Sequence, residues 1–121
     1  MKFYTAIYFV LMLSGFTHAT QFWTVRIDGG IHTSSQGAAA LNTGKFQPSG
    51  PIPRGTQWVA CKGNWIYFHK NAKGQLIDER FVDRMLSVAI SAFKTKSYVR
   101  VALERDSKNN CYTSQIFDLS N

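Results

Sequence analysis

Residues 79–104 pass from a helical repeat to a strand repeat with almost nothing between them. In the first part, apolar residues recur every three or four positions, which predicts an amphipathic helix over residues 79–94. In the last part they alternate, which predicts a strand over residues 98–104 with Arg100 on one of its two faces. A helix that leads directly into a strand favours folds in which a single helix packs against a sheet.

The predicted helix has one broad apolar face. Asp78 precedes it as an N-cap, because its carboxylate can accept hydrogen bonds from the backbone N–H groups of the first turn. Leu86 and Ile90 widen an apolar stripe that has four-residue spacing and consists of Phe81, Met85, Ala89 and Phe93. We expect this stripe to pack in the core, and its width also allows a helix–helix contact between subunits.

The rest of the chain reads mainly as strands. After the strand over 98–104, a polar turn at 106–110 leads to a returning strand over 111–119, which makes a hairpin. Before the helix, β-branched and aromatic residues predict strands over 57–61 and 65–69 and either a strand or an extended arm over 21–28. Residues 37–41 are either a helical turn or the start of a strand. We therefore predict a mostly β protein with one α-helix. The leading small design of that kind is a five-stranded antiparallel OB-fold barrel.

The N-terminus has the pattern of a secretory signal peptide. Lys2 precedes an apolar run over residues 6–13, and Ala19 provides a small residue for cleavage. A membrane anchor is the alternative, but the apolar run is too short to span a bilayer. We expect residues 1–19 to be removed and residues 20–121 to form a single domain that is secreted or periplasmic and does not insert into a membrane.

The two cysteines, Cys61 and Cys111, remain after this cleavage. In an exported chain a pair of cysteines predicts one disulfide, and two free buried thiols are the alternative. The sequence has no paired Cys or His spacing of the kind that zinc sites use, so we expect no metal and no cofactor.

The chain is basic, with a formal net charge of +7 that becomes +6 when Lys2 is removed. Such a charge suits anionic glycans, lipid headgroups, acidic proteins or nucleic acid. The basic residues are scattered, so a nucleic-acid-binding tail is not indicated. Single-stranded nucleic-acid binding by an OB-fold fits the charge and the aromatic content, but export argues against it.

A signal peptide followed by a series of short motifs resembles one protein family. The motifs are FWT at 22–24, LNTGKF at 41–46, VAC at 59–61, VRV at 99–101 and an ending IFDLSN. In order and spacing the chain resembles the B subunits of AB5 toxins, namely the pertussis-like, subtilase-cytotoxin-like and typhoid-toxin-like B chains. It also shares the plan of cholera-toxin-type B chains.

The resemblance implies a homo-oligomeric ring, expected to be a pentamer, in which the helices line a central pore. It implies binding of host-cell glycans of the sialic-acid type and a toxin A subunit as a partner that would carry any catalysis. In sialic-acid-binding members the arginine of the matching VR pair lies near the sugar, which implies a role for Arg100. A hydroxyl residue of that site corresponds by spacing to Thr33, with Ser34 and Ser35 beside it.

The residue chemistry is compatible with such a site. A guanidinium such as that of Arg100 can bind a sugar carboxylate through charge-assisted, bidentate hydrogen bonds, and hydroxyl groups donate and accept. An aromatic ring can cover the apolar side of a sugar, and Trp65, Tyr67 and Tyr98 are candidates. The alternative for Arg100 is an ion pair with an acidic neighbour such as Glu104 or Asp118.

Two other functions remain open at the level of sequence. One is an exported periplasmic OB-fold module that binds or inhibits another protein and has no toxin role. The other is a small secreted ribonuclease, in which His32 and His69 supply the acid and the base with Glu79 nearby.

Overall fold

The computed structural model describes residues 21–44 and 61–119. The predicted signal peptide, residues 1–19, and most of the predicted strand over 57–61 lie outside these ranges. In chain order the elements are β1 (Gln21–Arg26), β2 (Gly30–Thr33), β3 (Ala39–Asn42), the 3-10 helix η1 (Lys62–Asn64), β4 (Trp65–Tyr67), α2 (Glu79–Thr95), β5 (Tyr98–Arg105) and β6 (Cys111–Asp118). The ambiguous segment over 37–41 therefore leads into a strand.

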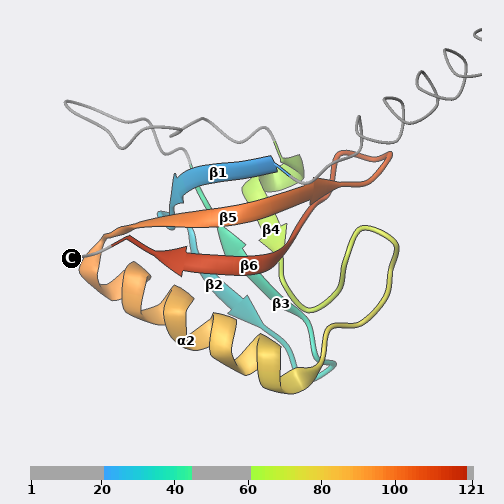
Figure 1. Ribbon diagram of the computed structural model, residues 1–121, viewed down its shortest axis with the longest axis horizontal. Helices are drawn as coiled ribbons and strands as arrows, with labels where there is room; N and C mark the ends of the chain where they lie inside the picture. Colours follow the sequence, from blue (N-terminus) through green and yellow to red (C-terminus); the bar gives the residue numbers. More distant parts are fainter. Residues whose placement is uncertain (1–20, 45–60, 120–121) are drawn as a thin grey trace, which may run out of the picture.

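The strands form one six-stranded sheet in the order β1-β5-β6-β4-β3-β2 (Figure 1). The neighbours pair antiparallel except β4 and β6, which are parallel. The prediction of a mostly β protein with one helix is confirmed. The predicted five-stranded antiparallel OB barrel is not confirmed, because the described residues form six strands in a mixed sheet. In the parts of the chain that the structure describes, no ladder closes this sheet.

Two glycines separate β1, which lies within the predicted strand over 21–28, from β2. Gly30 has φ +95°, a conformation that residues with a side chain rarely adopt. A Cβ on Gly29 would lie 2.1 Å from Oδ1 of Asn42, so the backbone can approach β3 only without a side chain at this position. The chain thus bends sharply between β1 and β2.

The predicted limits of the helix and its N-cap are confirmed, but only part of the predicted apolar stripe is buried in the core. The Arg80 amide donates to the Asp78 carboxylate at 2.9 Å. The residues that α2 buries are Met85, Ala89 and Ala92, whereas Phe81 and Phe93 are 52% and 41% exposed. A stripe of residues spaced four apart winds gradually around the helix, because four residues turn about 40° more than one full turn. The two ends of the predicted stripe therefore leave the core on opposite sides.

A helix-ending motif joins α2 to β5 within two residues. Lys96 adopts the left-handed conformation, with φ 55°. Its amide donates to the Phe93 carbonyl at 3.3 Å, and the Ser97 amide donates to the Ala92 carbonyl at 2.9 Å. These two bonds satisfy carbonyl groups that the helix end leaves open, as in a Schellman motif. The abrupt change of period in the sequence corresponds to this turn.

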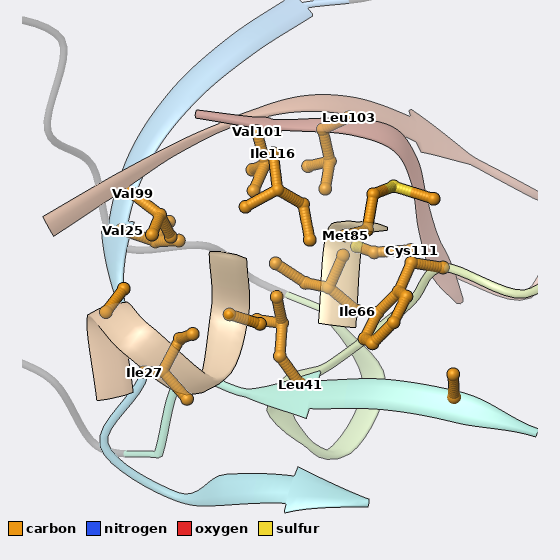
Figure 2. Packing of buried hydrophobic residues seen from close by; sticks show 14 of the residues in the cluster. Val25, Ile27, Leu41, Ile66, Met85, Val99, Val101, Leu103, Cys111 and Ile116 are labelled. Atoms are coloured by element: carbon orange, nitrogen blue, oxygen red, sulfur yellow. The ribbon is translucent and has the colours of Figure 1, made fainter. Parts of the chain in front are cut away.

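The core lies between the sheet and α2. Side chains from five strands and from the helix point into one cluster (Figure 2). The helix packs against β6 and also contacts β2, β3 and β5 (Figure 1). Its fully buried positions near the sheet include Ala89 and Ala92, whose small side chains let the two layers approach closely. The described residues contain no helix that is long and apolar enough to cross a membrane.

The predicted disulfide between Cys61 and Cys111 is confirmed, so the alternative of two free thiols is excluded. It joins the residue before η1 to the first residue of β6. The Lys62 amide also donates to the Asn109 carbonyl at 3.0 Å. Together these links attach the start of β4 to the β5–β6 hairpin. The parallel pairing of β4 with β6 forms next to them.

The turn of this hairpin is organised by the carboxylate of Asp106. Oδ1 accepts from the amides of Lys108 at 2.9 Å and Asn110 at 3.0 Å. Oδ2 accepts from the Asn110 side chain and from the Tyr112 hydroxyl, each at 3.0 Å. These hydrogen bonds, led by that of the Asn110 side chain, lower the pKa of Asp106 to about 2. Burial raises the pKa of Tyr112, and its bond to Asp106 adds to the shift.

The Asp106 carboxylate should make stability depend on pH in the acid range. Its pKa is about 2 in the fold against an ordinary value of 3.8. The stabilisation is therefore fully present above pH 3.8 and is lost as the pH falls through about 2. We expect Asp106→Asn to be less stable than wild type at neutral pH and to show a shallower loss of stability across this acid window. Urea unfolding at several pH values tests this, and parallel profiles for the two proteins would contradict it.

Candidate functional site

Arg100 lies in the middle of β5, on the side of the sheet that faces away from the core. Its neighbours Val99 and Val101 are fully buried, so the predicted alternation is confirmed around Arg100. It does not hold at Ala102, which is also buried, next to a register shift between Val101 and Leu103. The strand register places Arg100 opposite Thr24 of β1 and Phe117 of β6. The arginine is thus held between two other strands rather than at an edge of the sheet.

Two exposed aromatic rings lie next to this arginine. The Arg100 guanidinium carbon is 5.3 Å from the centre of the Phe22 ring, and the ring centres of Phe22 and Phe117 are 6.4 Å apart. The two phenylalanines are 49% and 47% exposed. We call Phe22, Arg100 and Phe117 the Arg100 cluster. Exposed phenylalanine pairs are costly in water, so such a cluster is a candidate contact surface.

Within the described ranges, Arg100 forms no ion pair. Glu104, one of its expected partners, instead accepts a hydrogen bond from the Ala72 amide at 3.4 Å. The contact with Phe22 is of the cation–π type and leaves the hydrogen-bond donors of the guanidinium available in the plane of the group. The cluster therefore presents a positive charge with unused donors between two apolar rings.

The three hydroxyl residues predicted from the resemblance lie elsewhere. Thr33 ends β2, and β2 is separated from β5 by three strands in the sheet order. The Ala38 amide donates to the Ser34 hydroxyl at 3.1 Å, so Ser34 holds a turn, while Ser35 is exposed at the tip of that turn. The structure therefore does not bring Thr33, Ser34 and Ser35 together with Arg100 in one chain.

Thr33 instead lines an open cleft of ≈ 410 Å³ between α2 and two connections. One connection is the turn over 34–38, and the other is the segment that leads from β4 to α2. The cleft is lined by Thr33, Gln36, Gly37, Ala38, Ala39, His69, Leu76, Ile77, Glu79, Val82, Asp83 and Leu86. Its carboxylates make the Thr33 side of the molecule unsuited to an acidic sugar, because like charges repel.

Aromatic side chains also gather around β4. The ring centres of Trp65 and His32 are 6.0 Å apart, and those of Tyr67 and Tyr112 are 5.7 Å apart. The Ala39 amide donates to Nδ1 of His69 at 3.0 Å, which ties this histidine to the backbone of β3. Of the two histidines considered for ribonuclease chemistry, only His69 lines the cleft, together with Glu79.

Sequence reasoning missed Phe22, Phe117 and the acidic side of the cleft. Phe22 and Phe117 lie far apart in the chain, and only the pairing of β1 and β6 with β5 brings them together. The four-residue spacing of Glu79 and Asp83 could have indicated one helix face, but not what that face would meet. In the described residues, no group of three or more His, Cys, Asp or Glu side chains lies close enough to hold a metal ion.

Comparisons of the chain with protein-family models, with curated proteins and with solved structures found no match.

Proposed function

We propose that this protein is a glycan-binding subunit of an AB5-like secreted toxin and that the Arg100 cluster contacts an acidic sugar of the sialic-acid type. The single observation that carries the proposal is an exposed arginine without an ion pair in the described residues, held against exposed aromatic rings. The proposal assigns no catalysis to this chain, and any catalysis would belong to a partner A subunit.

The chemistry of the cluster matches that of an acidic sugar. A guanidinium can donate two parallel hydrogen bonds to a carboxylate, and these are stronger than hydrogen bonds between neutral groups. The Phe22 and Phe117 rings can cover the apolar face of the sugar. Because Phe22 already restricts the Arg100 side chain, less conformational entropy is lost when a ligand binds.

The sheet topology supports an OB-type barrel as part of this proposal. The strands at the two ends of the sheet order, β1 and β2, are consecutive in the chain and joined only by residues 27–29. Counted as two halves of one bent strand, they would reduce the total to five, and the chain itself would link the two ends of the sheet. A five-stranded, partly open barrel of this type is the OB-fold, which often binds oligosaccharides.

The ring of subunits is also part of the proposal, with a homopentamer as the expected form. Ile90 and Phe93, on the C-terminal half of α2, are exposed apolar residues that a neighbouring subunit could cover. Several copies of a weak site on one ring would give strong attachment through avidity. The disulfide fits the proposed export, because disulfides persist in oxidising compartments.

A glycan array tests the proposal with the mature, oxidised protein. We expect binding to sialylated glycans and a loss of about tenfold or more in Arg100→Ala, since a hydrogen bond to a charged group contributes roughly 1.5–3 kcal/mol. Arg84→Ala is the matched control, because the Arg84 guanidinium lies over the Phe81 ring at 5.7 Å in a similar contact on α2. This control should bind like wild type.

The other outcomes are also informative. Sialoglycan binding that Arg100→Ala retains would move the site away from the Arg100 cluster. A blank array would favour an exported periplasmic protein-binding or inhibitor module. Light scattering on the same sample tests the ring, and a mass equal to one chain at micromolar concentration would count against it.

A further inference from the structure

The cleft beside the first turns of α2 has three walls of mixed character. The turn over 34–38 forms one wall, and the segment that carries Leu76 and Ile77 forms another. The third wall is α2 itself, through Val82 and Leu86 among others. Leu76 is 81% exposed at this cleft, so its aliphatic side chain would gain from being covered. The volume of ≈ 410 Å³ lies within the range of binding pockets.

The charge of this cleft is opposite to that of the protein as a whole. The chain has seven carboxylate side chains and a net charge of +7. Five of the seven have an interaction partner. Asp78 caps α2, Glu104 and Asp106 accept hydrogen bonds, and Asp28 forms an ion pair with Arg26. Asp118 at the end of β6 also has a partner.

Glu79 and Asp83 differ from those five. In the parts of the chain covered by the structure, neither side chain takes part in an ion pair or a hydrogen bond, and both line the cleft one helical turn apart. Glu79 lies in the first turn of α2, where the positive end of the helix dipole stabilises its negative charge. This effect falls off within one turn, so it does not stabilise the charge of Asp83.

We propose that the cleft binds a lysine or arginine side chain, flanked by aliphatic residues, of a partner polypeptide. The carboxylates of Glu79 and Asp83 would neutralise the cation. The aliphatic walls of the cleft would cover the aliphatic residues on either side of it. The same carboxylates repel phosphates and acidic sugars, which excludes nucleic acid and sialic acid as occupants. The inference does not depend on the glycan proposal, because it uses no residue of the Arg100 cluster.

A titration with synthetic peptides, followed by amide NMR on the oxidised protein, tests this inference. The probe is a capped Leu-Lys-Leu peptide, and a capped Leu-Gln-Leu peptide is its neutral counterpart. We expect saturable shifts of the Gly37 and Ile77 amides with the lysine peptide. The Glu79→Gln, Asp83→Asn double variant should bind about fivefold or more weakly, as expected for the loss of two exposed charge contacts.

Two controls separate this result from a general charge effect. Asp28→Asn removes a carboxylate that does not line the cleft and should leave the peptide affinity unchanged. At a salt concentration near 1 M the screening length is about 3 Å. This salt should weaken binding of the lysine peptide much more than binding of the neutral peptide. Circular dichroism should show that the double variant keeps its helix.

The inference is overturned if both peptides bind equally, or if the double variant binds the lysine peptide as well as wild type does. It is also overturned if the lysine peptide shifts the amides of Arg100 and Phe117 in place of those at the cleft. Failure of the glycan array would leave this result unaffected, since the two experiments address different surfaces.

Discussion

Replacing both cysteines by alanine should lower the free energy of unfolding by about 4 kcal/mol, because the disulfide closes a long loop in the unfolded chain. Cys61 and Cys111 are 50 residues apart in sequence, and Cys111 is fully buried where β6 begins. Small domains are stable by only about 5–15 kcal/mol, so this loss would remove a large part of the total.

The measurement is urea unfolding of the oxidised wild type and of the Cys61→Ala, Cys111→Ala variant. Wild type treated with a reducing agent is the control, because it loses the cross-link but keeps both side-chain sulfur atoms. We expect the reduced protein and the variant to unfold at similar, lower urea concentrations. If the variant unfolds at the same concentration as the oxidised protein, the cross-link does not stabilise the fold.

Phe68→Ala should have a comparable effect, with a loss of about 3–5 kcal/mol from the cavity that a deleted phenylalanine leaves. Among residues 21–44 and 61–119, Phe68 is the largest of the fully buried side chains, and it follows β4 directly. Its amide donates to the Ala39 carbonyl at 2.9 Å, so the backbone is held at this position and cannot easily move to fill the space.

Phe117→Ala is the matched control for this experiment, since it removes the same atoms from a side chain that is 47% exposed. We expect it to lose clearly less stability than Phe68→Ala, because nearly half of the surface that folding buries at Phe68 stays in water at Phe117. Thermal or urea unfolding of the two variants side by side is sufficient. Equal losses for both would contradict the idea that burial of the Phe68 ring causes the loss.

The Arg100 cluster illustrates how far sequence alone could define the candidate site. Alternation in the strand over 98–104 placed Arg100 on the outer face, and the structure confirms that placement. Thr33, Ser34 and Ser35 were grouped with it on the basis of a resemblance, and three strands separate them in the sheet order. Alternation shows which side of a strand a residue faces, but it does not show which strand lies next to it.

The sequence by itself determined the elements whose causes are local. The Asp78 cap and the limits of α2 follow from interactions between residues that are close in the chain. The alternation of β5 likewise follows from local geometry. The partner of each cysteine also followed, since the chain has only two, but the structure was needed to exclude two free thiols.

Only the tertiary structure decided the strand order, the parallel β4–β6 pair and the exposure of Phe81 and Phe93. It also decided that the two carboxylates of α2 face a cleft and that two phenylalanines flank Arg100. Each of these depends on contacts between segments far apart in the chain. Their free energies reflect the packing of the whole core, which the local pattern around a residue does not contain.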